Sequence, residues 1–223
     1  MIEAPHQTVF EKYKFNPFQV AVSEDVAVDF HSRHVEYFAG CSKVLDLGAG
    51  RGLFLRELKK KGIDGIGVEN DSESIKVGEK FGVRCIKADI FEFLRAEENR
   101  KIIGQCDGVY CAFVIEHLDP EQVFELFHLV RKNCAPNVRC RFITNNPEDL
   151  DVLGYTLWVD LTHRRLYPCD LLVAMARSQG FSVATAKVFS GLSLNWFQRF
   201  KVFICKLRWG AKRGSPNLLL DCS

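Results

Sequence analysis

Three glycines at alternate positions, Gly48, Gly50 and Gly52, follow an apolar run that predicts a buried strand. Residues 53–60 then have helical spacing and end in two lysines. Glycine lets a backbone approach a ligand closely, and the first N–H groups of a helix have no partner inside that helix. This strand, turn and helix could therefore hold a ligand against main-chain amides. An ordinary glycine-rich turn is the alternative, because lone glycine motifs occur in many proteins.

A carboxylate follows the glycine turn at the spacing expected for a residue that binds the ribose of a nucleoside. Glu69 lies 21 residues after Gly48, at the end of the second predicted strand. An acid about 20 residues beyond such a turn can accept hydrogen bonds from ribose hydroxyls. A solvated carboxylate at a strand end is the alternative interpretation, and the spacing favours the ribose role.

Two histidines are candidates for proton transfer, because imidazole titrates near neutral pH. His163 is the first candidate for a general base, with Asp160 three residues earlier to orient it. His117, which follows the fourth predicted strand, is the second. A structural role is an equal alternative for His117. No set of histidine, cysteine and aspartate has metal-ligand spacing, so the sequence predicts that no metal is bound.

Three stretches together identify a family. The glycine turn follows the acidic Asp46 and has Leu53 where a dinucleotide fingerprint has its third glycine. Residues 113–120 read F-V-I-E-H-L-x-P, and residues 160–167 read D-x-T-H-x-R-x-Y. Over about residues 40–190 the chain resembles class I S-adenosylmethionine (SAM)-dependent methyltransferases. The second stretch is similar to quinone-type and other small-molecule enzymes, and the third to glycosyltransferase-associated enzymes.

The resemblance implies SAM as the cofactor and assigns its site. In the family, an acid at the place of Asp89 accepts a hydrogen bond from the adenine amino group, and the N–H of the next residue, here Ile90, donates to the ring. The full set of cofactor-binding residues that we carry over is Asp46, Gly48, Ala49, Gly50, Gly52, Glu69, Asn70, Asp89, Ile90, Ala112 and Phe113.

The sequence predicts that these residues are positioned by the strands and helices of an α/β fold. Apolar runs predict strands at 44–47, 65–70, 83–90, 107–115, 139–144, 181–189 and 217–221. Helical spacing predicts helices at 26–38, 53–60, 71–81, 121–133 and 169–179. The resemblance implies a Rossmann-like, doubly wound, mostly parallel seven-stranded sheet of order 3-2-1-4-5-7-6, with strand 7 antiparallel.

We expect one domain over residues 1–223, with an N-terminal cap and helix at 1–40 and a basic amphipathic insertion at 191–216 before the last strand. The nine cysteines are odd in number and include no C-x-x-C, which favours reduced thiols and a cytoplasmic protein. The net charge of +2 does not demand a nucleic-acid partner.

Residues 196–213 contain six basic and no acidic residues, with aromatic and aliphatic side chains on one helical face. Packing of that face on the protein is the first interpretation. Peripheral contact with an anionic membrane is the second, since aromatic and basic residues suit its interface. A phosphate-binding patch for RNA is the third.

The predicted function is SAM-dependent O-methylation of a sugar, glycan or other small-molecule hydroxyl. Two alternatives stay open: an RNA methyltransferase that uses the basic segment, and a non-catalytic SAM-binding scaffold. The expected partner is a small-molecule or glycan acceptor, and the sequence leaves the oligomeric state open.

Overall fold

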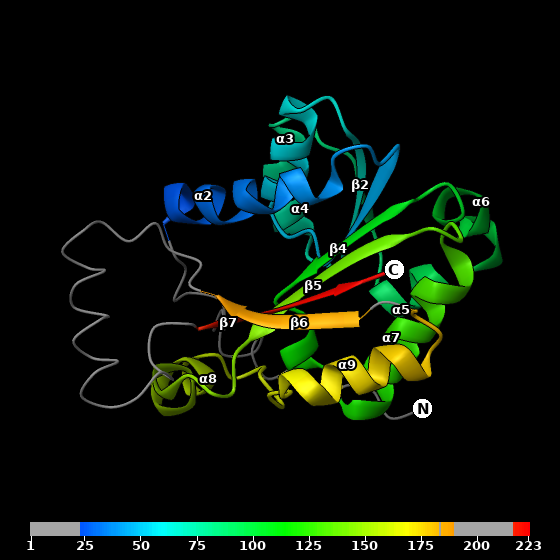
Figure 1. Cartoon of the computed structure of the whole chain (residues 1–223). Helices are drawn as coiled ribbons and strands as arrows, with labels where there is room; N and C mark the ends of the chain where they lie inside the picture. Colours follow the sequence, from blue (N-terminus) through cyan, green and yellow to red (C-terminus); the bar gives the residue numbers. More distant parts are fainter. Residues whose placement is uncertain (1–22, 183, 190–215) are drawn as a thin grey trace, which may run out of the picture.

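The computed structural model describes residues 23–182, 184–189 and 216–223 (Figure 1). Residues 1–22 of the predicted N-terminal cap and helix (1–40), and residues 191–215 of the predicted basic insertion (191–216), lie outside these residues, so their roles stay predictions. Among the residues described, no helix has the length and apolar character needed to cross a bilayer.

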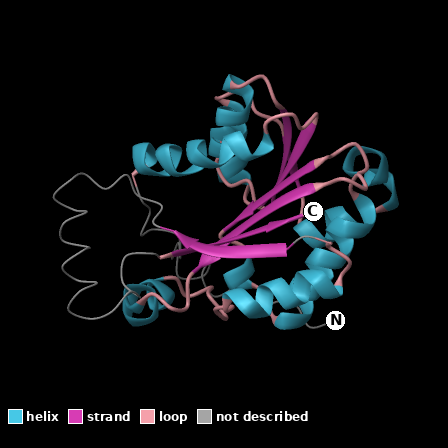
Figure 2. Ribbon diagram, viewed as in Figure 1, coloured by secondary structure: helices cyan, strands magenta, loops and turns pink. Residues whose placement is uncertain are grey.

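The described strands form one seven-stranded sheet in the order β3-β2-β1-β4-β5-β7-β6 (Figure 2). The strands are β1 (Lys43–Leu47), β2 (Asp64–Glu69), β3 (Cys85–Lys87), β4 (Gly108–Ala112), β5 (Arg139–Asn145), β6 (Ala184–Phe189) and β7 (Asn217–Cys222). β7 pairs antiparallel with both β5 and β6, whereas the pairs among β1 to β5 are parallel. The predicted fold, strand order and direction of strand 7 are confirmed.

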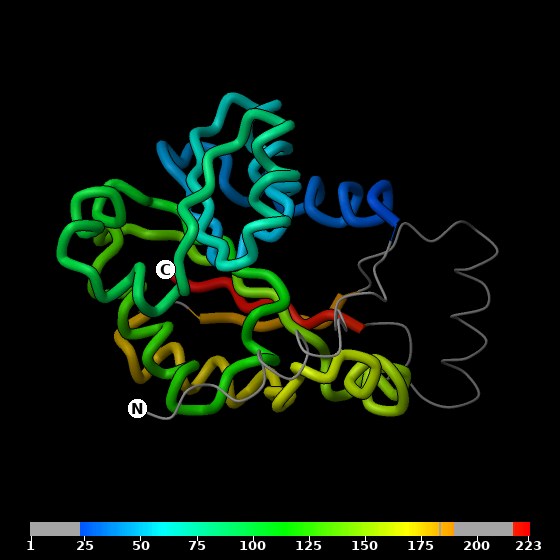
Figure 3. Tube along the Cα trace, turned by 180° about the vertical axis from the view of Figure 1, so that it is seen from behind, coloured from blue at the N-terminus to red at the C-terminus, as the bar shows by residue number. Residues whose placement is uncertain are grey.

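Helices cover both faces of the sheet, as Figures 1 and 3 show from opposite sides. The α-helices are α2 (Glu24–Val35), α3 (Leu53–Lys60), α4 (Ser72–Glu79), α5 (Ile90–Arg95), α6 (Arg100–Ile103), α7 (Pro120–Asn133), α8 (Leu157–Val159) and α9 (Cys169–Ser178). The 3₁₀ turns are η1 (Glu36–Phe38), η2 (Glu97–Asn99) and η3 (Ile115–His117), and η4 (Val152–Thr156) is a π-helix.

Each face has its own apolar core. α5, α7 and α9 pack on one face around a cluster that includes Phe127 and Phe142, both fully buried. α2 and α3 pack on the other, where the rings of Phe54 and Tyr110 stack with centroids 3.7 Å apart. Strands that helices cover on both faces have nearly continuous apolar sequences, which is why β1 and β4 could be predicted from the sequence.

Several predicted boundaries differ from the structure, and among the strands the third differs most. β3 has only three residues instead of the expected 83–90, because the Asp89 carboxylate accepts N–H bonds that begin α5. Residues 97–101, where the sequence predicted no helix, belong to η2 and α6. Buried Ile103 at the end of α6 explains this, since its side chain packs in the core beside the charged surface.

Candidate active site

The predicted site residues gather at one edge of the sheet. β1, β2, β4 and β5 run parallel, so their carboxyl ends lie along the same edge. The backbone N–H groups of Gly48 and Ala49 donate to the Val68 carbonyl at the end of β2, at 2.9 and 3.1 Å. A Cβ on Gly48 would lie 2.5 Å from Val114 Cγ2, so the turn after β1 touches the turn after β4. The loops of three strands therefore meet around the glycine turn.

The glycine turn requires glycine for two separate reasons. Gly48 has φ +75° and no room for a side chain beside Val114. Gly50 has φ +51°, but nothing lies within 4 Å of where its Cβ would be. The backbone at Gly50 thus faces open space that a ligand could occupy. We call the turn of residues 48–52 the cradle.

Glu69 turns its carboxylate toward this turn. Its Oε2 accepts the Gly50 N–H at 2.7 Å, and its Oε1 accepts the N–H groups of Asn70 and Asp71, both at 2.9 Å. Three main-chain donors fix the carboxylate, which offers about four acceptor positions and so keeps capacity for a further donor. Its place beside the cradle agrees with the predicted ribose contact, which stays a prediction.

Asp46 is the second carboxylate beneath the turn, and only 2% of it is exposed. Burial, and then the negative charge of Glu69, raise the pKa of Asp46 well above its usual value. The described residues form no ion pair with either carboxylate. A ligand with positive charge would relieve their repulsion. SAM, the cofactor that the resemblance implies, carries such charges on its sulfonium and ammonium groups.

Asp89 has a structural task whether or not adenine binds. Its Oδ1 accepts the N–H groups of Phe91 at 2.8 Å and Glu92 at 3.1 Å, which caps α5. Ile90, the expected donor to the adenine ring, is the first residue of that helix. Both residues follow β3, which lies beside β2 in the sheet.

The end of β4 carries backbone strain. Phe113, directly after Ala112, has φ +58° and is the only described non-glycine residue with positive φ. Its N–H donates to Ile143 O at 2.8 Å, and its side chain is 38% exposed. Such strain costs about 1–3 kcal/mol and clusters at ligand sites. The observation favours the predicted cofactor role of Ala112 and Phe113.

A buried carboxylate lies farther along the same edge. Glu116 is fully buried, and its two oxygens accept hydrogen bonds from Thr144 Oγ1 at 2.8 Å and Asn145 Nδ2 at 3.1 Å. Burial raises its pKa to about 7. Its carbonyl accepts the N–H groups of Arg164 and Arg165 at 2.9 and 3.2 Å, which ties the 160–168 stretch to the turn after β4.

His117 and His163 lie side by side, with ring centroids 4.8 Å apart. Thr162 Oγ1 gives its proton to Asp160 Oδ1 at 2.6 Å, because a carboxylate only accepts. His117 Nδ1, 2.9 Å from the same hydroxyl, is therefore the donor in that contact. Burial, and then the neighbouring His163, lower the pKa of His117. Neutral His117 thus keeps its lone pair on Nε2.

His163 has the same tautomer for a similar reason. Its Nδ1 lies 3.1 Å from Leu157 O, an acceptor, so Nδ1 carries the proton and Nε2 the lone pair. Asp160 Oδ2 is 4.0 Å from that Nε2, which is an electrostatic contact rather than a hydrogen bond. The Leu157 carbonyl, and not Asp160, therefore makes the hydrogen bond that orients the His163 ring.

Tyr167, the last residue of the D-x-T-H-x-R-x-Y stretch, is fully buried and donates its hydroxyl to Leu118 O at 2.6 Å. This contact anchors the stretch. Sequence spacing also missed one cluster: the ligand atoms of Glu116, His117 and His163 lie within 4.8 Å of one another. His163 comes 46 residues after His117, so local spacing carries no signal for it.

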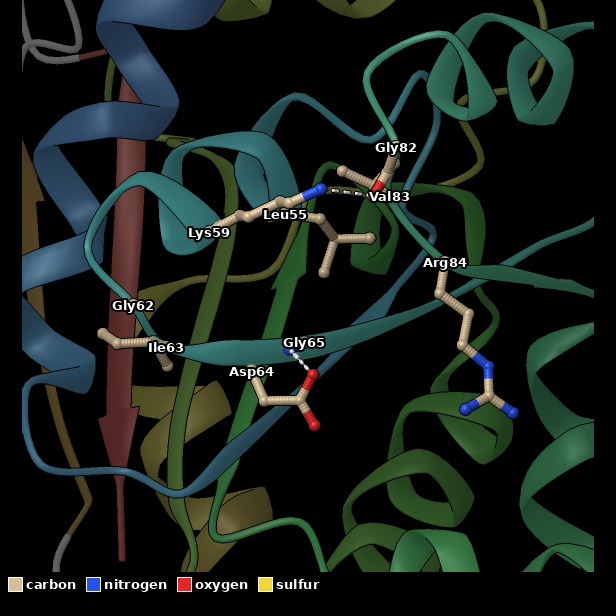
Figure 4. Close-up of a pocket in the computed structure, with 9 residues that line it drawn as sticks. All are labelled: Leu55, Lys59, Gly62, Ile63, Asp64, Gly65, Gly82, Val83 and Arg84. Atoms are coloured by element: carbon tan, nitrogen blue, oxygen red, sulfur yellow. Dashed lines mark hydrogen bonds between the residues drawn. The ribbon is translucent and has the colours of Figure 1, made fainter.

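A hollow of about 360 Å³ lies at the other edge of the sheet (Figure 4). It is lined by the end of α3 and by the residues at the start of β2 and before β3, where Lys59 Nζ donates to Gly82 O at 3.0 Å. Because these are the amino ends of parallel strands, this pocket is separate from the site described above.

Comparisons with known proteins agree with this fold. A family described as a methyltransferase domain matches residues 21–186, about three quarters of the chain. A solved SAM-dependent methyltransferase from Archaeoglobus fulgidus is 25% identical with a TM-score of 0.72, over 98% of this chain and 99% of the other. No curated protein matches.

Two further structures share the fold. A SAM-dependent methyltransferase from Thermotoga maritima is 14% identical with a TM-score of 0.64, over 98% of this chain and 95% of the other. A methyltransferase solved in complex with the Haloferax volcanii Trm112 activator is 14% identical with a TM-score of 0.65, over 88% and 89%. The chain belongs to the methyltransferase-domain family and is a SAM-dependent methyltransferase.

Proposed function

We propose that this methyltransferase acts on a hydroxyl group of a sugar, glycan or other small molecule, and that His163 accepts the hydroxyl proton. The observation that carries the proposal is the fixed tautomer of His163. Its Nδ1 proton is held by the Leu157 carbonyl, so the Nε2 lone pair is available on the edge that also holds the glycine turn. The D-x-T-H-x-R-x-Y resemblance of residues 160–167 supports a glycan or sugar acceptor.

The chemistry makes modest demands on the protein. SAM supplies a methyl group that its positive sulfur has already activated. The acceptor oxygen bonds to the methyl carbon as the carbon–sulfur bond breaks, the electron pair goes to sulfur, and the hydroxyl proton goes to His163 Nε2. Asp160 Oδ2, 4.0 Å away, stabilises the resulting imidazolium. The remaining task is to hold the reactants in line and exclude water.

The test is the turnover of a His163→Ala variant, after a screen of acceptor pools with labelled SAM. General-base catalysis contributes about 10²–10⁴-fold, so we expect a loss of turnover of that order with the dissociation constant of SAM unchanged within twofold. His128→Ala, on the exposed side of α7, is the matched control. An equal loss of SAM affinity would show that His163 is structural.

We also propose that residues 196–213 bring the enzyme to an anionic membrane surface, on the composition of that segment alone. Flotation with anionic liposomes tests this. RNA filter binding at two salt concentrations tests the nucleic-acid alternative, which requires affinity that falls steeply with salt.

A further inference from the structure

We propose that Glu116, His117 and His163 form a binding site for one divalent first-row transition cation. This inference rests on the O-methylation that we propose, because the cation would lie where the acceptor hydroxyl is expected, and it replaces direct proton transfer to His163. It also departs from the expectation of a metal-free enzyme, which rested on sequence spacing alone.

The side chains offer the donor set that such a cation prefers. Two imidazole nitrogens and one carboxylate oxygen lie within 4.8 Å of one another. Two histidines and one carboxylate are a recurrent ligand set for first-row divalent metals that keep further positions open for substrate. Magnesium and calcium prefer oxygen ligands and should bind here more weakly.

The tautomers of both rings suit this task. Metal-binding histidines typically donate the proton of their other ring nitrogen to an oxygen. His117 Nδ1 donates to Thr162 Oγ1 at 2.9 Å, and His163 Nδ1 donates to Leu157 O at 3.1 Å. Both Nε2 lone pairs are therefore unprotonated in the neutral rings. The chain Asp160–Thr162–His117, with its first bond at 2.6 Å, resembles the outer contacts of a metal ligand.

Glu116 is held in the same manner. Thr144 and Asn145 each donate to one of its oxygens, at 2.8 and 3.1 Å, and leave acceptor capacity on both. The carboxylate is fully buried, and no described lysine, arginine or histidine forms an ion pair with it. Burying an unpaired carboxylate is costly, and a bound cation would compensate that cost.

The cluster is close to, but wider than, a closed coordination sphere. Ligand atoms about 2.1 Å from one cation lie about 3.0–3.5 Å apart at octahedral or tetrahedral angles. The observed limit of 4.8 Å therefore requires side-chain movements of about 1 Å. Both histidines lie outside the strands, His117 in η3 and His163 after α8, so these movements need no change in the sheet.

Cation binding would give His163 a different part in the reaction. Its Nε2 cannot both coordinate a metal and accept a proton. A cation would instead bind the acceptor oxygen and lower the pKa of its hydroxyl, so that the proton can pass to water. The predicted loss of turnover in His163→Ala is the same in either case, which is why the test must measure binding itself.

The experiment measures Mn²⁺ binding to tag-free, EDTA-stripped full-length protein by the loss of the free-Mn²⁺ electron paramagnetic resonance signal and by calorimetry. We expect one Mn²⁺ per chain, displaced by Zn²⁺ far more readily than by Mg²⁺. His117→Gln and His163→Gln should each weaken binding at least tenfold, and His128→Gln should not. Thermal melting establishes that each variant is folded.

Thr162→Val is a second variant, which keeps all three ligands and removes the hydroxyl that fixes His117. We expect it to weaken Mn²⁺ binding about 10–100-fold. No saturable Mn²⁺ binding, or binding that the cluster variants leave unchanged, overturns the site. SAM affinity is measured in the same stripped protein: if SAM binds and Mn²⁺ does not, only the cation proposal fails and direct proton transfer to His163 stands.

Discussion

Glu69→Gln is the sharpest test of the cofactor cradle. The carboxylate accepts the N–H groups of Gly50, Asn70 and Asp71 from two sides, on different oxygens. A glutamine has one oxygen and one NH₂ group, so either Gly50 or the Asn70–Asp71 pair must face a donor instead of an acceptor. The substitution also removes the charged acceptor that we expect a ribose hydroxyl to use.

The size of the effect follows from these contacts. A hydrogen bond to a charged group contributes about 1.5–3 kcal/mol, which corresponds to about 10–150-fold in affinity. The mismatched donor should cost about 1–2 kcal/mol of folding stability, and a chain of this size then loses roughly 2–8 °C in Tm. We therefore expect weaker binding of SAM and S-adenosylhomocysteine together with a moderate fall in Tm.

Calorimetry at 25 °C with both ligands measures the affinity, and thermal unfolding measures the stability. Glu73→Gln is the control, because that carboxylate is 78% exposed on α4 and pairs with Lys76 at 2.7 Å. It removes the same charge four residues away. A Glu69→Gln protein with normal Tm that binds S-adenosylhomocysteine within twofold of the unmodified protein would refute our assignment of the cradle.

Two further predictions concern the turn and the α2 face. Gly48→Ala should abolish SAM binding, because the new Cβ would lie 2.5 Å from Val114 Cγ2. Gly50→Ala has open space around its Cβ, so it should cost only the roughly 1–2 kcal/mol of folding stability that a left-handed non-glycine residue costs. Calorimetry and thermal unfolding compare the two variants, and equal effects would count against the close approach of Gly48 and Val114. His34 is 3% exposed, and burial followed by Arg141 lowers its pKa to about 3. Below about pH 6.5 the unfolded chain binds a proton at His34, whereas the folded chain does not. The free energy of unfolding is therefore largest above pH 6.5, and about 2 kcal/mol of it is lost by pH 5. His34→Gln keeps an acceptor for Arg141 and should remove that loss, which urea unfolding at pH 7.5 and 5 measures; the same loss in both proteins would contradict the reasoning.

The sheet could be predicted because its strands are covered on both faces. The apolar run at 44–47 covers all of β1 except Lys43, the run at 107–115 contains β4, and a glycine turn marks where β1 ends. The end of β3 could not be predicted from the same signal. Asp89 looks like the last residue of a strand, but its carboxylate caps α5, and this competition depends on contacts that periodicity does not describe.

The closeness of the glycine turn and Glu69 could be predicted from the sequence for a topological reason. Parallel neighbours bring the ends of β1 and β2 to one edge, so Gly50 and Glu69 had to be close, and the structure joins them by a hydrogen bond of 2.7 Å. The tautomer of His117 could not be predicted, because it depends on how Thr162 divides its hydrogen bonds between Asp160 and the ring.

The strand order explains why both halves of the site meet where they do. The sheet runs β3-β2-β1 in one direction from its middle and β4-β5 in the other, so the chain reverses its winding between β1 and β4. In open α/β sheets ligands bind at such a switch point, outside the carboxyl ends of the strands. Gly48 follows β1 and Val114 follows β4, and their close approach marks that point. Because the glycine turn follows β1 and His117 follows β4, we expect the methyl donor and the histidine pair on opposite sides of this switch point.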